Sequence, residues 1–198
     1  MIALAEVLKE AGRHLDRAGF RWALVGGLAV AIHAEPRLTR DVDLAVAVAD
    51  DQQAESLIYE LQQRGYQVIA SIEQDARQRL ATIRLVPPGQ ESDAIVVDLL
   101  FASSGIEPEI VEGARQTEIF PGVTAPVASR GHLLALKILA RDDRGRPHDY
   151  DDLLRLLEEA SSADLEQARQ ALRRISDRGY DRGRELLRSF EDLLEATG

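Results

Sequence analysis

Three aspartates in two predicted strands have the residue type and spacing for shared chemistry. Asp41 and Asp43 stand two residues apart at the start of an apolar segment, so they face the same side of a strand. Asp98 interrupts the apolar run 94–101, and no basic residue lies within ten positions of it. A carboxylate in such a run must be paired, hydrogen-bonded or bound to a metal. If the strands are neighbours, the three carboxylates form an oxygen-rich set, which suits Mg²⁺ or Mn²⁺.

A glycine pair, Gly26 and Gly27, joins a predicted buried strand at 22–25 to a predicted helix at 28–34. Backbone N–H groups at a helix N-terminus bind phosphate oxygens readily. Two metal ions about 3.5–4 Å apart can clamp an in-line phosphoryl displacement. The combination favours phosphoryl chemistry. Each feature taken alone has a structural alternative, a tight turn that needs glycine or a polar strand entrance without function.

The order of these elements resembles a known family. The segments 25–33 (VGGLAVAIH) and 37–44 (RLTRDVDL) look like the opening motif of the nucleotidyltransferase superfamily typified by DNA polymerase β. The likeness is closest to the prokaryotic AbiEii-type branch, which includes toxins of toxin–antitoxin systems. It covers most of residues 20–155.

The resemblance implies a set of site residues. The implied catalytic and metal-binding residues are Asp41, Asp43 and Asp98, with Mg²⁺ or Mn²⁺ as cofactor. The implied nucleotide-binding residues are Gly26, Gly27, Arg37, Thr39, Arg40, Lys137, Asp149 and Asp152. For Arg37 and Arg40, contact with the acceptor is the alternative to contact with the triphosphate. For Thr39, support of the loop is the alternative to a phosphate contact.

Lys137 stands out independently of the family, because the chain has 22 arginines and only two lysines. It lies in a segment, 130–141, that is apolar on nearly all sides, and its compact ammonium suits a single phosphate oxygen. The alternative is a surface lysine whose stem covers apolar residues. Asp149 and Asp152 are three apart, so one helix face can carry both. They either pair with Lys137 or Arg141 or orient the nucleotide, and Asp149 also suits an ordinary helix N-terminus.

The periodicity predicts an α/β (α+β) fold, a mixed-sheet core at 1–127 followed by a C-terminal helical bundle at 128–198. The resemblance implies that this core is a nucleotidyltransferase core. The predicted strands are 22–25, 42–48, 66–71, 79–86, 94–101 and a pair within 116–127. The predicted helices are 2–18, 28–34, 51–64, 106–114, 130–141, 148–159, one beginning at 161 or 162, and one around 186–194.

Composition limits the partners. The net charge of −10 argues against broad binding to nucleic acid. A run of arginines between 169 and 188 forms either a patch for a polyanion or a solvated surface with acidic partners. The chain has no cysteine, which excludes disulfides and thiolate metal sites. No apolar run approaches a membrane span, so we expect a cytoplasmic protein with no membrane partner.

The aspartates and the glycine turn, together with the resemblance, predict a metal-dependent nucleotidyltransferase that moves a nucleoside monophosphate from an NTP to an acceptor hydroxyl. The resemblance suggests an RNA end, especially tRNA, or a protein as acceptor, and a cognate antitoxin as partner; a small molecule remains open. The alternative is a non-catalytic nucleotide-binding module acting with a partner protein. A phosphohydrolase is less favoured, because such enzymes usually recruit histidines to their metals.

Overall fold

The computed structural model describes residues 2–34, 39, 41–74, 78–90, 95–141 and 147–197, except for the side chains of residues 2 and 147–149. Within these residues, seven strands form one mixed sheet in the order β3-β4-β5-β2-β1-β7-β6. The strands are β1 (Trp22–Val25), β2 (Asp41–Val46), β3 (Gln67–Gln74), β4 (Arg79–Val86), β5 (Val96–Leu100), β6 (Arg115–Phe120) and β7 (Val123–Val127). The helices are α1 (Ile2–Arg17), α2 (Gly26–His33), α3 (Asp51–Gln63), α4 (Glu107–Glu112), α5 (Arg130–Ala140), α6 (Pro147–Glu158), α7 (Ser162–Asp177) and α8 (Leu186–Thr197).

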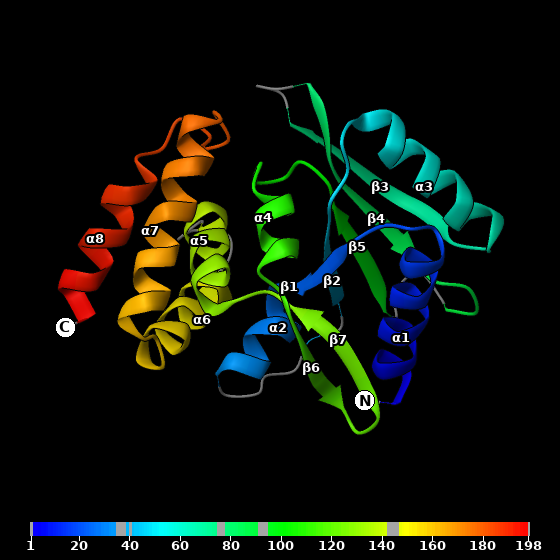
Figure 1. Ribbon diagram of the computed structural model, residues 1–198, viewed down its shortest axis with the longest axis horizontal. Coiled ribbons are helices and arrows are strands. Elements are labelled where there is room, and N and C mark those ends of the chain that lie inside the picture. Colours follow the sequence, from blue (N-terminus) through cyan, green and yellow to red (C-terminus); the bar gives the residue numbers. More distant parts are fainter. Residues whose placement is uncertain are drawn as a thin grey trace.

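The middle of the sheet is built from its most apolar strands. All four residues of β1 are buried, and β1 pairs antiparallel with β2 and parallel with β7. Strand β2 in turn runs parallel to β5. In Figure 1, α1 and α3 lie on one side of the sheet and α5 to α8 on the other. Helix α1 buries an apolar stripe at helical spacing, namely Leu4, Val7, Leu8, Ala11 and Leu15.

The helical part is organised around α5, which packs against α2, α6, α7 and α8. A helix surrounded in this way must be apolar on most sides, which explains the composition of the segment 130–140. Ser129 caps it by accepting a hydrogen bond from the backbone N–H of His132, as its residue type predicts. Ser161 and Asp164 form a capping box at the start of α7.

The predicted mixed sheet followed by helices is confirmed, with element ends shifted by a few residues. Strand β2 begins at Asp41 and ends at Val46 because its pairing with β1 ends at the Trp22–Val46 pair. Helix α2 begins earlier than predicted, at Gly26. The division into parts at residue 127 stays a prediction. None of the described helices combines the length and apolarity that a membrane crossing requires.

Candidate active site

The strand register brings two of the three predicted aspartates side by side. In the parallel pair β2–β5, Asp43 lies directly opposite Asp98, and Asp41 lies one pleat repeat away on the same face of β2. All three line a cleft of about 980 Å³. Gly26, Gly27 and Thr39 line the same cleft. The structure therefore brings the three carboxylates and the glycine turn together in one cleft, as the sequence predicted.

Gly26 has a role that spacing alone did not reveal. Its φ of +64° is in the left-handed region, and a Cβ atom there would overlap the carboxylate of Asp43. The close approach follows from the antiparallel pair β1–β2, in which Val25 lies opposite Asp43. The first glycine of the pair thus makes room for the carboxylate of Asp43 as well as shaping the turn.

Asp43 is held in an unfavourable electrostatic environment. Burial, reinforced by the neighbouring charges of Asp98 and Asp41, raises the pKa of Asp43 to about 7. Across the described part of the chain, the carboxylates of Asp41 and Asp43 have no hydrogen-bond or ion-pair partner. A cation between them would offset the repulsion, and the all-oxygen donor set fits Mg²⁺ or Mn²⁺.

The carboxylates are close, but they do not form a closed metal cage. Among the described residues, no three acidic or histidine side chains are gathered tightly enough to hold an ion together as they stand. Asp98 is instead engaged by Arg84 of the adjacent strand β4, through Nε to Oδ1 at 2.8 Å and Nη2 to Oδ2 at 2.7 Å. That all three aspartates bind metal stays a prediction.

Sequence reasoning missed Arg84. It looked for partners of Asp98 nearby in the chain, whereas Arg84 is 14 residues away and lies opposite Asp98 in the antiparallel pair β4–β5. The available signal was the arginine in the middle of the predicted strand 79–86, since an arginine and a carboxylate on neighbouring strands can pair.

Lys137 lines the cleft from α5 and forms an ion pair with Asp152 of α6, with Nζ 2.7 Å from Oδ2. The side chain of Asp152 is fully buried. Pairing with Lys137 was one of the two alternatives for Asp152, and the structure contains that pair. Arg37 and Arg40 lie outside the described residues, as does the side chain of Asp149, so their predicted contacts cannot be placed.

The cleft contains aspartates on two strands, a glycine turn and a lysine on a helix. A comparison with known protein families gives a match over most of the chain. The family model described as "Nucleotidyl transferase AbiEii toxin, Type IV TA system" matches residues 13–196. The chain belongs to this AbiEii family. It is therefore a nucleotidyltransferase, as the resemblance in its motifs implied.

Solved structures support the fold of this AbiEii-family chain. An antigenic nucleotidyltransferase-like protein from Paracoccidioides brasiliensis is 19% identical, with a TM-score of 0.51 over 95% of this chain and 92% of that one. The antibiotic-resistance factor ANT(2'')-Ia is 15% identical, with a TM-score of 0.50 over 98% of this chain and 95% of that one. No curated protein is similar enough in sequence to count as a match.

A second arginine that sequence reasoning did not place at the site, Arg182, lines the cleft from the α7–α8 connection. Its φ of +58° is in the left-handed region, which costs an arginine about 1–2 kcal/mol. The connection is fastened on two sides. Tyr180 packs where a Cβ at Gly105 would stand, and Arg184 donates to the carbonyl oxygen of Leu139 at 3.1 Å. Figure 1 shows this connection at the same end of the molecule as the β3–β4 hairpin.

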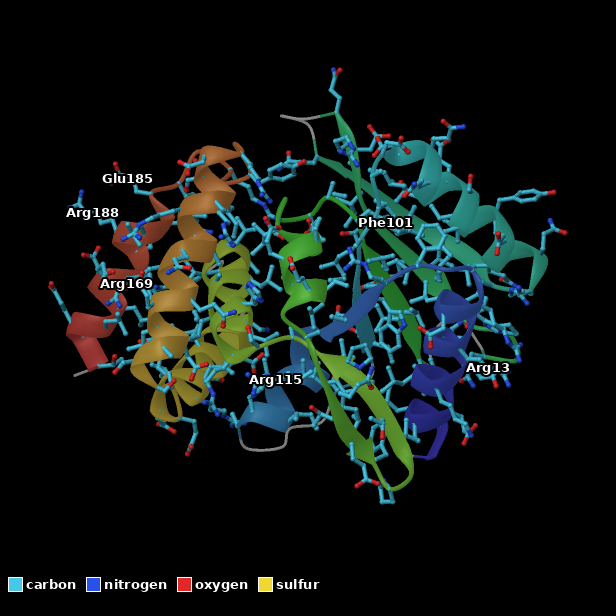
Figure 2. The ribbon with its side chains drawn as sticks, viewed as in Figure 1. Arg13, Phe101, Arg115, Arg169, Glu185 and Arg188 are labelled. Carbon is cyan, nitrogen blue, oxygen red and sulfur yellow. The ribbon has the colours of Figure 1, made fainter. Side chains whose placement is uncertain are left out.

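Most of the other arginines in the C-terminal helices of this chain form ion pairs with acidic side chains. The pairs include Arg169 with Glu191, Arg173 with Glu166, Arg178 with Glu109, and Arg188 with Glu185. Figure 2 shows Arg169, Glu185 and Arg188 on the outer side of the helices, away from the sheet. This favours the solvated-surface alternative over a ready-made patch for a polyanion.

Proposed function

We propose that this AbiEii-family nucleotidyltransferase moves a nucleoside monophosphate from an NTP to an acceptor hydroxyl with the help of a divalent metal ion. The observation that supports this most strongly is the register of β2 and β5, which sets Asp43 beside Asp98 in a cleft that also contains the glycine turn and Lys137. Phosphoryl transfer needs little covalent chemistry from the protein, so positioning and charge carry the catalysis.

In this proposal Asp41 and Asp43 hold the metal ion, which, when bound, supplies Lewis-acid stabilisation of the triphosphate. The backbone N–H groups at Gly26 and Gly27 bind phosphate oxygens at the N-terminus of α2. Lys137 neutralises the charge that develops on the leaving pyrophosphate. Thr39, which also lines the cleft, completes the nucleotide contacts. Arg37, Arg40 and Asp149 remain predicted nucleotide-binding residues.

Asp98 is proposed to face the acceptor. Each of its oxygens has a lone pair beyond the one that Arg84 occupies, so it can still accept a hydrogen bond from an acceptor hydroxyl. The hydroxyl oxygen attacks the α-phosphorus, the bond from that phosphorus to the bridging oxygen breaks, and the electron pair leaves with pyrophosphate. The hydroxyl proton passes by way of Asp98 to solvent. Asp152, being fully buried, acts by positioning Lys137.

For the acceptor we propose an RNA end, with tRNA foremost, or a protein hydroxyl, and for the biological setting a toxin–antitoxin pair with a cognate antitoxin. The family description, a toxin of a Type IV system, supports the setting. A small-molecule acceptor is the alternative, supported by the similar fold of an antibiotic-resistance factor.

The test is to incubate the protein with each α-labelled NTP, Mg²⁺, and total cellular RNA or protein, and to follow the label. We expect label in a macromolecular product and release of pyrophosphate. Asp43→Asn abolishes both and keeps the fold, whereas Asp192→Asn, at an exposed carboxylate on α8, changes neither. Nucleotide binding without transfer under every condition would instead identify a non-catalytic binding module. Full activity of Asp43→Asn refutes the assignment.

A further inference from the structure

Arg84 engages both oxygens of the Asp98 carboxylate. Both oxygens of Asp98 accept hydrogen bonds from one guanidinium, in the bidentate geometry that matches arginine to a carboxylate. Asp98 is only 6% exposed, so this pairing takes place at the floor of the cleft. The Arg84 side chain is 44% exposed and reaches that floor from the solvent side.

The backbone holds the pair in place. Arg84 and Asp98 are direct partners in the antiparallel ladder of β4 and β5, and β4 has a strand on each side. On the other side of Arg84, in β3, lies Ala70, whose small side chain leaves the guanidinium room to turn toward β5. The register that puts Asp98 beside Asp43 therefore also delivers a positive charge to Asp98.

A guanidinium in this position has consequences for metal binding. The lone pairs of Asp98 that face Arg84 are engaged, and the fixed positive charge next to them opposes the approach of a second cation. Asp41 and Asp43 carry no such partner among the described residues. The three carboxylates are thus divided into two that are open to a metal ion and one that is already matched with a cation.

In place of the sequence-based prediction that all three aspartates bind metal, we propose that Arg84 takes the place of a second divalent cation at Asp98, so that this site holds one metal ion, at Asp41 and Asp43. The inference rests on the proposed nucleotidyl transfer and specifies how its charge is distributed. Arg84 is a positioning residue: it fixes the orientation of Asp98 toward the acceptor and supplies the positive charge that would otherwise require another ion.

The test counts Mn²⁺ bound per chain, using the metal alone and the full chain, by the loss of the free-Mn²⁺ electron paramagnetic resonance signal. The unchanged protein is expected to saturate at one ion. Arg84→Met removes the charge at similar length and is expected to admit a second ion at Asp98. Arg84→Lys keeps a cation there and is expected to stay at one ion.

Two further variants keep the test decisive. Arg79→Met is the matched control, because Arg79 lies on the same strand and pairs with Asp51, and neither residue lines the cleft. It is expected to bind one ion. The double variant Arg84→Met/Asp98→Asn removes both charges of the pair, so it leaves no buried lone charge if Arg84→Met alone fails to fold. It is expected to bind one ion with a dissociation constant within threefold of that of the unchanged protein.

The inference is overturned if folded Arg84→Met stays at one ion, or if the double variant binds its ion more than about tenfold more weakly, the loss expected when a group supporting a metal site is removed. Because the count involves no nucleotide and no turnover, it is independent of the transfer assay. Absence of transfer with all NTPs would defeat the proposed function while the metal count still decides the role of Arg84.

Discussion

The raised pKa of Asp43 leads to a prediction about stability. The substitution Asp43→Asn, which is expected to abolish activity, is expected to make the protein more stable. Asp43 binds a proton up to about pH 7 in the native protein, whereas its ordinary pKa is 3.8. Between these values the native state holds a proton that the unfolded chain has released, so the free energy of unfolding falls as pH rises. Stability from this group is fully present below about pH 4 and has been lost above about pH 7. We therefore expect Asp43→Asn to stabilise the metal-free protein at alkaline pH.

The magnitude follows from the pKa difference. Each pH unit across which the two states differ by one proton is worth about 1.4 kcal/mol. The interval from 3.8 to about 7 therefore corresponds to at most about 4 kcal/mol. For a chain of this size, a gain of about 3 kcal/mol raises the melting temperature by roughly 6–12 °C. Asparagine keeps the shape of the side chain and cannot ionise, so it avoids this cost.

The assay is urea unfolding of the unchanged protein and Asp43→Asn in EDTA at pH 4.5 and pH 8. The variant is expected to gain about 2–4 kcal/mol relative to the unchanged protein between the two pH values. Mn²⁺ at about 100 times its dissociation constant is expected to restore about 2.7 kcal/mol to the unchanged protein only. Asp192→Asn serves as the control for a change in net charge. A stability difference between Asp43→Asn and the unchanged protein that is the same at both pH values refutes the reasoning.

Three further substitutions test other contacts of the cleft. Gly26→Ala is expected to destabilise the protein by more than about 2 kcal/mol in thermal melts, and by only about 1 kcal/mol in an Asp43→Gly background, because removal of the whole side chain, including the Cβ atom, leaves only the backbone strain at position 26. Equal costs in both backgrounds would contradict the overlap. Asp152→Ala leaves the ammonium of Lys137 buried without its carboxylate and is expected to cost about 3–5 kcal/mol in urea unfolding, whereas Lys137→Met/Asp152→Leu costs clearly less. Arg182→Gly is expected to raise the free energy of unfolding by up to about 1 kcal/mol, because glycine adopts the left-handed backbone conformation at this position without strain. It is also expected to raise the KM for the nucleotide or the acceptor. Unchanged kinetics would show that Arg182 does not belong to the site.

The parts of the site that the sequence predicted are those with short-range signatures. Asp41 and Asp43 were recognisable from their spacing, and Asp98 from its interruption of an apolar run. The burial of Lys137 was foreseeable because its helix is apolar on nearly all sides. In each case the local chain limits where the side chain can point.

The remaining parts depend on contacts between distant segments. The pairing of Arg84 with Asp98 needs the register of β4 on β5, and a slip of one residue would place Arg84 on the other face of the sheet. The overlap of Gly26 with Asp43 likewise depends on how β1 meets β2. Arg182 reaches the cleft only because the connection that carries it is fastened to elements far away in the chain. Periodicity contains none of this information.

The fastening of the α7–α8 connection has a consequence for the protein during its synthesis. Lys137 meets Asp152 only after α6 has formed, and the α7–α8 connection that carries Arg182 is fastened only after Arg184 has bonded to the carbonyl of Leu139. All three aspartates leave the ribosome long before those contacts exist. A chain paused in translation before residue 184 would carry its carboxylates and glycine turn beside an unfinished wall of the cleft, so we expect nucleotidyl transfer only after residue 184 has left the ribosome.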